Sequence, residues 1–280
     1  MQILDGRALS LKIKNKAKED IKILREKGIT PGLAVVIIGD DPASHTYVRM
    51  KEKACEEVGI YSILHKMPAD ISQDKIIETI EMMNKNPNID GILIQLPLPS
   101  HIDTRKILQT VIAAKDVDGF HPFNVGKLSL KLDTFTPCTP LGVMRLLEEY
   151  KIDPKGLDTC IVGASDIVGK PMMNLLLNAD ATVDICHIHT KSLKEHTKRA
   201  DLLIVGVGKP DLITEDMVKD GAIIIDIGIN RLESGKLIGD VSYEEVAPKC
   251  SFITPVPGGV GPMTIAMLLE NTIKATRNRL

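Results

Sequence analysis

The chain has 280 residues, of which 44% are hydrophobic and 26% charged, a composition typical of folded proteins and long enough for two ordinary domains. Its 35 basic and 37 acidic residues are interspersed and it contains no Trp, so we expect no nucleic-acid partner. No apolar run approaches the roughly 18 residues that a membrane helix needs. The five scattered cysteines are typical of reduced thiols, so we expect a cytoplasmic protein without membrane contact.

The first 100 residues predict helices alternating with apolar strands. A helical pattern from about 8 to 27 ends at Gly28, and the β-branched run LAVVIIG at 33–39 predicts a buried strand. After a helix that follows Pro42, the alternation continues with the strand YSILHKM, a helix and the strand IDGILIQLPLP. The apolar residues of that helix are Ile76, Ile77, Ile80, Met82 and Met83. Apolar strands without internal alternation, separated by helices, predict a parallel sheet covered on both faces.

The segment SHTYVRMKEKACEEVGI, at 44–60, predicts a helix with a lysine on its apolar face. We expect Asp41 to cap this helix and Pro42 to take its first position. The helical spacing puts these residues on one face: Tyr47, Lys51, Ala54, Cys55 and Val58. Lys51 therefore points toward protein rather than water, unless its stem reaches solvent along its own length.

The pattern breaks and then restarts in the second half. Residues 120 to 140, rich in Pro, Gly and Thr, predict a crossing between domains, and a helix capped by Thr139 follows. The strand–helix alternation returns with the apolar runs DTCIV, ATVDICH, ADLLIVGVG, GAIIIDIGIN and SFITPVPGGVGP and a last helix, MTIAMLLENTIKATRN. The predicted fold class is α/β: two α/β domains around a cleft, the second a Rossmann-like parallel sheet.

The stretch IVGASDIVGKP is a candidate nucleotide-binding turn. Gly163 directly follows a strand and Gly169 lies in the next helix, so backbone N–H groups at the helix start can meet a pyrophosphate. Ser165 takes the position of the middle glycine in the usual G-x-G-x-x-G pattern, and its hydroxyl can add a donor. A merely structural strand–helix turn remains the alternative interpretation.

The end of the strand ATVDICH indicates which nucleotide would bind. An NAD site usually presents a carboxylate there, whereas this strand runs into His187, His189, Thr190 and Lys191. The missing carboxylate favours NADP, with His189, Thr190 or Lys191 as candidate contacts or else as solvated loop residues. The Cys-His-Ile-His run at 186–189 has no second ligand cluster in the sequence, so we expect no metal site.

Tyr47 and Lys51 also match the catalytic Tyr-x-x-x-Lys pair of short-chain dehydrogenases. In that family the nucleotide turn precedes the pair by more than a hundred residues. Here the pair stands at 47 and 51 and the turn at 163, so the order argues against that family.

Eight segments together resemble one family along the entire chain, the bifunctional methylenetetrahydrofolate dehydrogenase/methenyltetrahydrofolate cyclohydrolases. The segments, in order, are SHTYVRMKEKACEEVGI, GILIQLPLP, KDVDGF, TPCTPLGVMRLL, VGASDIVGKPM, ADLLIVGVGKP, GAIIIDIGIN and TPVPGGVGPMTIAMLLENT. The resemblance implies oxidation of 5,10-methylenetetrahydrofolate by NADP and hydrolysis of the methenyl product to 10-formyltetrahydrofolate. The alternatives are a dehydrogenase that lacks the hydrolytic step and a catalytically silent nucleotide-binding protein.

The resemblance also implies roles for four residues of the first domain. Lys51 matches the family's catalytic lysine; desolvation disfavours a charged amine, which would suit it to acid–base work at neutral pH. Gln95 matches its hydrogen-bond partner, and Tyr47 matches the ring that packs on the folate. Asp118 matches the anchor of the pterin, with Asp116 as the less certain of the two aspartates.

By the same resemblance, the second domain holds NADP. Gly163, Ala164, Ser165 and Ile229, with His189 and Thr190, are its expected contacts, and the loop with Pro257, Gly258 and Gly259 is expected between folate and nicotinamide. The domain boundaries that we predict are 1–118 with 264–280 for the folate domain and 119–263 for the NADP domain. The resemblance further implies a homodimer.

Overall fold

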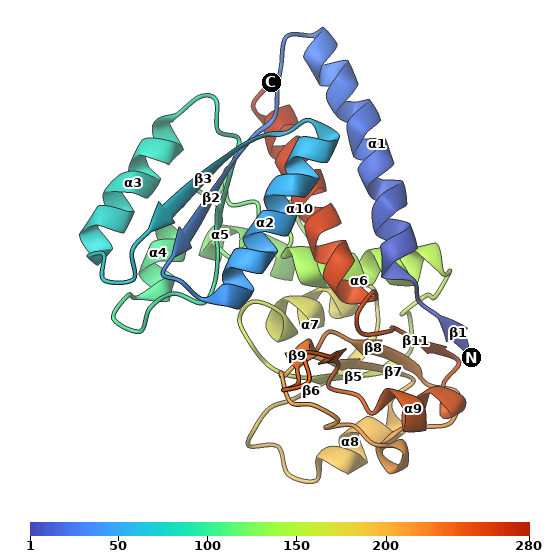
Figure 1. The fold of residues 1–280 in the computed structure, drawn as a ribbon. Helices are drawn as coiled ribbons and strands as arrows, with labels where there is room; N and C mark the ends of the chain where they lie inside the picture. Colours follow the sequence, from blue (N-terminus) through green and yellow to red (C-terminus); the bar gives the residue numbers. More distant parts are fainter. The chain divides into compact units, whose positions relative to one another are not determined.

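The computed structural model describes all 280 residues, and they form two compact units (Figure 1). The six-stranded unit comprises Met1–Ser10 and Thr139–Thr264, and the three-stranded unit comprises Leu11–Cys138 and Ile265–Leu280. None of the helices combines the length and the apolar character that crossing a membrane requires.

The three-stranded unit is built on a parallel sheet in the order β3-β2-β4. The central strand β2 (Gly32–Ile38) is buried at all seven positions, and β3 (Tyr61–Met67) and β4 (Gly91–Ile94) pair with its two edges. Such a strand is apolar on both faces because helices cover both, so it lacks the alternation of a half-exposed strand. The predicted parallel sheet is therefore confirmed.

The three-stranded unit also contains six helices. They are α1 (Gly6–Glu26), α2 (Pro42–Val58), α3 (Gln73–Lys85), α4 (Thr104–Thr110), α5 (Pro122–Ser129) and α10 (Val260–Asn278), of which α1 and α10 also contribute residues to the other unit. Ala34, Val36 and Ile38 alternate along β2 and pack against α3 and α4 through Ile76 and Ile107.

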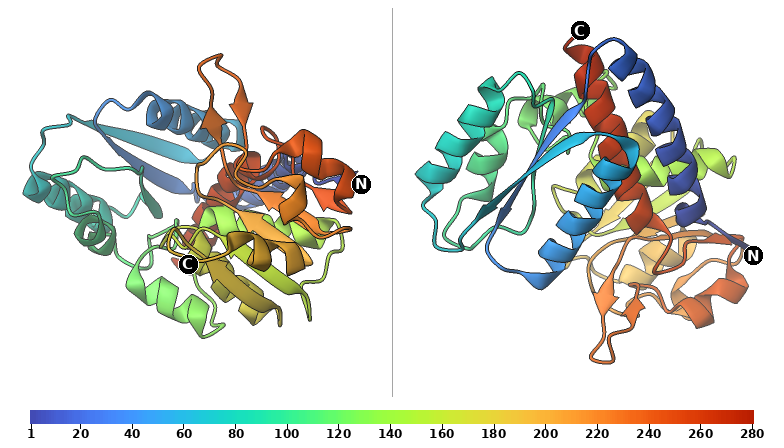
Figure 2. Two further views of the ribbon diagram at one scale, coloured as in Figure 1. Left: turned by 90° about the horizontal axis from the view of Figure 1, so that it is seen from below. Right: turned by 45° about the horizontal axis from the view of Figure 1, so that its top comes forward.

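The six-stranded unit contains a parallel sheet in the order β1-β11-β8-β7-β5-β6. Its strands are β1 (Gln2–Ile3), β5 (Asp158–Val162), β6 (Thr182–Cys186), β7 (Leu202–Val205), β8 (Ile223–Asp226) and β11 (Phe252–Ile253). A separate antiparallel hairpin, β9 (Asn230–Arg231) with β10 (Leu237–Ile238), projects from this unit (Figure 2). The helices are α6 (Cys138–Glu149), α7 (Gly169–Asn178), α8 (Leu193–Arg199), α9 (Tyr243–Val246) and the 3-10 turns η1 (Glu215–Met217) and η2 (Ala247–Lys249).

The order of these strands creates a point where the chain changes direction across the sheet. From β5 the chain passes through α7 to β6 on one side, and from β6 it returns through α8 to β7 on the other side of β5. In open α/β sheets, ligands bind at the carboxyl ends of the strands that flank such a point. The Rossmann-like prediction for this half of the chain is thereby confirmed.

The chain passes from the three-stranded unit to the six-stranded unit between Cys138 and Thr139, inside the segment 120–140 that was predicted as a crossing. The same segment also contains α5, because the Asp116 carboxylate accepts hydrogen bonds from the His121 backbone N–H and from Asn124 Nδ2, both at 2.8 Å. The predicted cap of the following helix is wrong. The next helix begins at Cys138 rather than after a Thr139 cap, and the Thr139 hydroxyl lies 3.0 Å from that of Thr264.

The two units divide the chain at residues that differ from the boundaries 1–118, 119–263 and 264–280. Residues Met1–Ser10 belong to the six-stranded unit because β1 pairs with β11. Residues 119–138 belong to the three-stranded unit because α5 is tied to Asp116. A two-residue strand such as β1 is too short to give a periodic signal in the sequence.

Candidate functional site

The helix α2 orients Lys51 toward the interior of the three-stranded unit. As predicted, Asp41 caps the helix, its carboxylate accepting a hydrogen bond from the Ser44 N–H at 2.7 Å, and Pro42 opens the first turn. The buried face of α2 carries Ser44, Val48, Lys51, Ala54, Cys55 and Val58. Lys51 retains only 9% exposure, so its burial on the apolar face is confirmed.

A neutral amide receives the Lys51 amine. Lys51 Nζ donates to Gln95 Oε1 at 3.0 Å. The other end of that amide is fixed, because Gln95 Nε2 donates to the Leu96 carbonyl at 2.7 Å. Gln95 directly follows β4, and its backbone N–H extends the sheet pairing to the Val36 carbonyl. A glutamine oxygen orients an amine without the fixed negative charge that a carboxylate would add.

Asp118 supplies a negative charge that acts on this pair. Burial raises the pKa of the Asp118 carboxyl, the positive charge of Lys51 opposes that rise, and the charge of Asp116 adds to it. Lys51 and Asp118 therefore interact electrostatically, as a predicted shared site requires. Asp116 itself is buried, and its Oδ2 accepts two bonds from the start of α5, so we assign it to the scaffold.

Tyr47 lies one helical turn before Lys51 and is partly exposed. Burial raises the pKa of its phenol, so the hydroxyl remains protonated at neutral pH and is available as a donor. We call Tyr47, Lys51, Gln95 and Asp118 the Lys51 cluster. A protein-held amine, an orienting amide, a carboxylate and an aromatic ring can together bind a polar heterocycle and transfer a proton to or from it.

Two residues beside the Lys51 cluster were not predicted. Asn271, on the last helix, donates through Nδ2 to the Val117 carbonyl at 2.8 Å and to the Thr136 carbonyl at 3.0 Å. Cys138 Sγ also contacts the Val117 carbonyl, at 3.6 Å. Together they fix the backbone that carries Asp118. In the sequence, Asn271 stands out only as an amide within the apolar run MLLENT. Its two partners could not be identified there, because they lie 154 and 135 residues away along the chain.

In the six-stranded unit, the glycine turn lies at the point where the sheet changes direction. Gly163 follows β5 with φ +120°, and a Cβ there would lie 2.5 Å from the Gly206 carbonyl oxygen, which follows β7. A Cβ on Gly169 would lie 1.9 Å from the Gly163 carbonyl oxygen. Both positions therefore require glycine, and the first turn of α7 packs directly against the loop.

Ser165 and Ala164 occupy the open part of this turn. The Ser165 hydroxyl oxygen accepts a hydrogen bond from the Val168 N–H at 3.2 Å, so it satisfies one backbone donor ahead of α7. The hydroxyl hydrogen of Ser165 can therefore donate to a bound ligand. The exposed Asp166 is paired with Lys170 one turn into the helix.

The loop after β6 carries imidazole rings and a hydroxyl. His187 organises it: the His187 N–H donates to Thr190 Oγ1 at 2.8 Å, and the His189 N–H donates to His187 Nδ1 at 3.1 Å. The rings of His187 and His189 meet edge to face at 5.9 Å. His189 is exposed, and Ile188 is 93% exposed.

Ile229 and the loop at 257–259 lie in this same unit. A Cβ on Gly261 would lie 3.4 Å from Ile229 Cδ1, so the two segments are neighbours. Gly258 has φ +117°, and its carbonyl accepts from the Arg7 N–H at 2.9 Å. The structure therefore groups Pro257, Gly258 and Gly259 by unit with Gly163 and Ile229, whereas the Lys51 cluster belongs to the other unit.

A buried pair of aspartates behind Ile229 was not predicted as a site feature. Asp226 accepts hydrogen bonds from the Gly228, Asp240 and Val241 N–H groups, and Asp240 Oδ2 accepts from the Val207 and Gly208 N–H groups. These bonds tie together the ends of β7 and β8. We assign both carboxylates to the scaffold of the loops.

Comparison with known families gives matches over most of the chain. Residues 4–118 match the family described as tetrahydrofolate dehydrogenase/cyclohydrolase, catalytic domain. Residues 137–280 match tetrahydrofolate dehydrogenase/cyclohydrolase, NAD(P)-binding domain. The chain is 67% identical over 278 residues to the bifunctional protein FolD of Nautilia profundicola, an alignment that covers 99% of this chain and 98% of the relative.

Solved structures agree with these matches. The bifunctional enzyme FolD, methylenetetrahydrofolate dehydrogenase/cyclohydrolase, from Campylobacter jejuni superposes with a TM-score of 0.99 at 57% identity, covering 100% of both chains. The Trypanosoma brucei methylenetetrahydrofolate dehydrogenase-cyclohydrolase, solved with NADP cofactor and an inhibitor, gives a TM-score of 0.95 at 34% identity and covers 99% of this chain and 97% of that one.

Proposed function

Because this chain belongs to the tetrahydrofolate dehydrogenase/cyclohydrolase family, we propose its activity and assign its site residues from that premise. The chain is a bifunctional enzyme of one-carbon metabolism. It oxidises 5,10-methylenetetrahydrofolate to the 5,10-methenyl cation and hydrolyses that cation to 10-formyltetrahydrofolate. The observation that carries the residue assignment is the bond from the buried Lys51 amine to Gln95.

Lys51 is the acid–base group of the hydrolytic step. Addition of water to the bridging carbon requires loss of a proton from that water, and ring opening requires a proton on the departing nitrogen. One amine beside the bridge can carry the proton between the two. Gln95 orients the amine, since its oxygen accepts from Nζ while its own N–H is bound to Leu96. Tyr47 supplies the ring that packs on the folate.

Asp118 anchors the pterin. A carboxylate can accept two parallel N–H bonds from an aminopyrimidine edge, which fixes both distance and orientation. We assign that role to Asp118 rather than Asp116, because the Asp116 Oδ2 already accepts bonds from the His121 N–H and the Asn124 amide. Asn271 positions the strand end that carries Asp118 through its bond to the Val117 carbonyl.

The six-stranded unit binds NADP, which when bound accepts the hydride from the bridging carbon. The glycine turn fits a dinucleotide: with Cβ atoms absent at Gly163 and Gly169, a phosphate can approach the N–H groups at the start of α7. Ala164 and Ser165 are the residues that would contact it, and Ile229 and the loop at 257–259 would border the nicotinamide. At the end of β6, His189 and Thr190 are the proposed contacts of the 2′-phosphate, since no carboxylate is present to repel it.

We further propose that the enzyme works as a homodimer in the cytoplasm. The dimer rests on the family resemblance. The compartment is supported by five free cysteines, all of them buried, which is the state expected in a reducing environment. Sedimentation of the purified chain at micromolar concentration tests the dimer.

Paired assays test the function. Purified protein is expected to reduce NADP with methylenetetrahydrofolate and, separately, to hydrolyse methenyltetrahydrofolate without NADP. Lys51→Met should lower methenyl hydrolysis by about 100-fold or more, in line with loss of a general acid–base group, while circular dichroism remains unchanged. Lys53→Met, which removes an exposed charge from the opposite face of α2, is the matched control and should retain full activity.

The outcomes separate the rival functions. NADP reduction without methenyl hydrolysis in the unmodified protein would leave a dehydrogenase alone. Tight NADP binding with neither reaction would indicate a silent nucleotide-binding protein. Methenyl hydrolysis that survives unchanged in folded Lys51→Met would remove Lys51 from the mechanism.

A further inference from the structure

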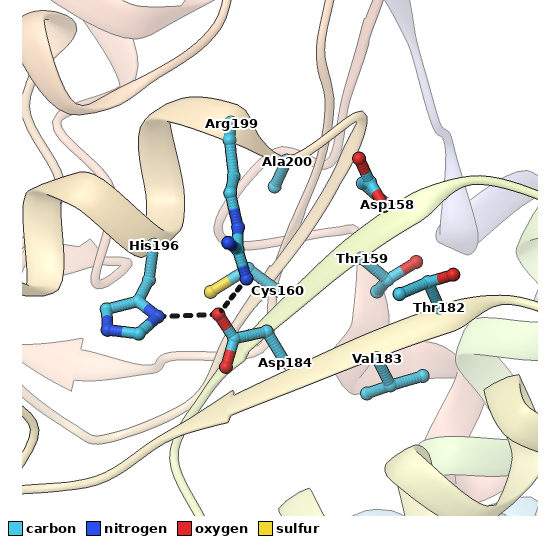
Figure 3. A pocket seen from close by; sticks show the side chains of 9 residues that line it. All are labelled: Asp158, Thr159, Cys160, Thr182, Val183, Asp184, His196, Arg199 and Ala200. Atoms are coloured by element: carbon cyan, nitrogen blue, oxygen red, sulfur yellow. Dashed lines mark hydrogen bonds and ion pairs between the residues drawn. The ribbon is translucent and has the colours of Figure 1, made fainter.

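A small pocket at the edge of the six-stranded sheet gathers metal-ligating side chains (Figure 3). It has a volume of about 120 Å³ and lies between the strands β5 and β6 and the helix α8. Cys160 from β5, Asp184 from β6 and His196 from α8 line the pocket. Cys186, on β6, does not line it, but its sulfur lies within 4.8 Å of ligand atoms of Asp184 and His196. Asp184 and Cys186 are two residues apart on one strand, so their side chains point to the same face.

We propose that Cys160, Cys186, His196 and Asp184 form a binding site for a thiophilic divalent cation, with zinc as the best match. Two thiolates, an imidazole and a carboxylate are a ligand set that tetrahedral zinc accepts. The proposal concerns a site apart from the Lys51 cluster and the glycine turn, and it does not depend on the proposed function.

The distances support one shared ion. Cys160 Sγ and Cys186 Sγ are 3.9 Å apart. Two sulfurs bound to one tetrahedral zinc, each at about 2.3 Å, are separated by about 3.8 Å. Ligand atoms of Asp184, Cys186 and His196 all lie within 4.8 Å of one another, and His196 Nδ1 lies 2.5 Å from Asp184 Oδ2. Asp184, Cys186 and His196 therefore form a group of three neighbouring ligands, and Cys160 adjoins that group through the Cys186 sulfur.

The charges also fit a divalent ion. Two thiolates and one carboxylate carry three negative charges. A bound divalent cation would neutralise two of them and leave one negative charge. Arg199 Nη2 already bonds Asp184 Oδ2 at 2.8 Å and supplies the remaining positive charge (Figure 3). Thiols bind zinc as thiolates, so binding of the ion would release two protons.

Such an ion would brace the strands that end at the nucleotide turn. β6 ends at Cys186, whose carbonyl accepts from the Gly163 N–H at 2.9 Å, and the loop from His187 to Thr190 follows at once. Bridging Cys160 to Cys186 would therefore link β5 to β6 beside this loop. We expect the bound ion to raise the thermal stability of the six-stranded unit.

Metal titration tests the site in the full-length reduced protein. Zn²⁺ added in competition with a chromophoric chelator should bind one ion per chain with a Kd of roughly 1 µM or lower. Co²⁺ should give the absorption bands of thiolate-to-cobalt charge transfer, which a carboxylate or imidazole site does not produce. Mg²⁺ should not compete, because it prefers oxygen ligands.

Matched variants identify the ligands. Cys160→Ser and Cys186→Ser should each weaken Zn²⁺ binding by about 100-fold, and His196→Gln by about 10-fold or more. Cys250→Ser is the control, since Cys250 is also buried in this core but donates to the Val246 carbonyl instead. If the two cysteine variants fail to fold, the zinc affinity of His196→Gln tests the site instead. This variant is expected to fold because the His196 side chain is 33% exposed. Equal zinc affinity in the control and in all folded variants, or a Co²⁺ complex without charge-transfer bands, would overturn the proposal.

Discussion

Lys51 is the buried residue to which we assign the acid–base role. Its amine is bonded to a neutral oxygen of Gln95, while the carboxylate of Asp118 acts on it only through space. A buried lysine paired directly with a carboxylate would be held in its charged form. The neutral partner fixes the geometry of the amine without adding a negative charge.

Asp118 is the second residue whose role follows from its surroundings. Asp118→Ala is expected to raise the KM for methylenetetrahydrofolate by about 10-fold or more, because a charged hydrogen bond to the ligand is worth roughly 1.5–3 kcal/mol. The KM for NADP should change by less than about 2-fold. Steady-state kinetics with each substrate varied in turn gives both values.

The control for this prediction is Asp70→Ala, which removes an exposed aspartate of the same unit. It should alter neither constant. An equal rise of both KM values in Asp118→Ala would contradict the pterin assignment.

At the scale of elements, the segment from the end of β5 to the start of α7 meets three structural requirements. The strand must end at the point where the sheet changes direction, the turn must take a left-handed conformation, and the helix must begin against the loop. Gly163 at φ +120° and the close approach of Gly169 satisfy the last two. Ser165 stands where the usual G-x-G-x-x-G pattern has its middle glycine. A side chain is accommodated there, and its hydroxyl oxygen accepts a hydrogen bond from the Val168 N–H.

Gly163→Ala tests this element. A Cβ would lie 2.5 Å from the Gly206 carbonyl oxygen at a strained φ, so we expect a loss of about 1–3 kcal/mol in the free energy of unfolding. The KM for NADP should rise, and methenyl hydrolysis, which uses no NADP, should be affected less. Urea denaturation and the two assays measure these effects.

Gly126→Ala is the matched control, since this glycine lies inside α5 and an added Cβ would meet no atom within 4 Å beyond its own stretch of helix. Alanine should be neutral there or stabilise the helix by up to about 1 kcal/mol. Identical losses in both variants would show that the turn at 163 has no special requirement for glycine.

At the scale of the whole molecule, Asp226 contributes to the pH dependence of stability. Asp226 is 4% exposed, and burial raises the pKa of its carboxyl to about 6 from an ordinary 3.8, against the backbone hydrogen bonds that lower it. Between these two values the folded chain binds more protons than the unfolded chain. The contribution of Asp226 to stability is therefore complete below about pH 4 and is lost as pH rises through 6, by about 3 kcal/mol in total.

Comparison with Asp226→Asn isolates this contribution. The amide disturbs the hydrogen bonds from Gly228, Asp240 and Val241 by a fixed amount, but it does not titrate. The free energy of unfolding of the variant, relative to the unmodified protein, should therefore increase by up to about 3 kcal/mol between pH 4 and pH 7. Urea unfolding at several pH values measures it, and a pH-independent difference would refute the raised pKa.

Local patterns were enough to predict most of the elements and the roles of several residues. The unbroken apolar runs identified the parallel strands, the spacing on α2 identified the buried face with Lys51, and the Asp41–Pro42 pair identified where that helix begins. These features depend on side chains a few residues apart, which a sequence displays directly. The eight ordered segments added the family, and with it the expected reaction.

Only the tertiary structure decided which distant residues meet. It joined β1 to β11, turned 122–129 into a helix by bonding it to Asp116, and brought Asn271 to the backbone beside Asp118. It also supplied the second ligand cluster that the sequence lacked, because Cys160 and His196 reach Cys186 from a neighbouring strand and a packed helix. Such contacts depend on strand order and helix packing, and no spacing along the chain encodes them.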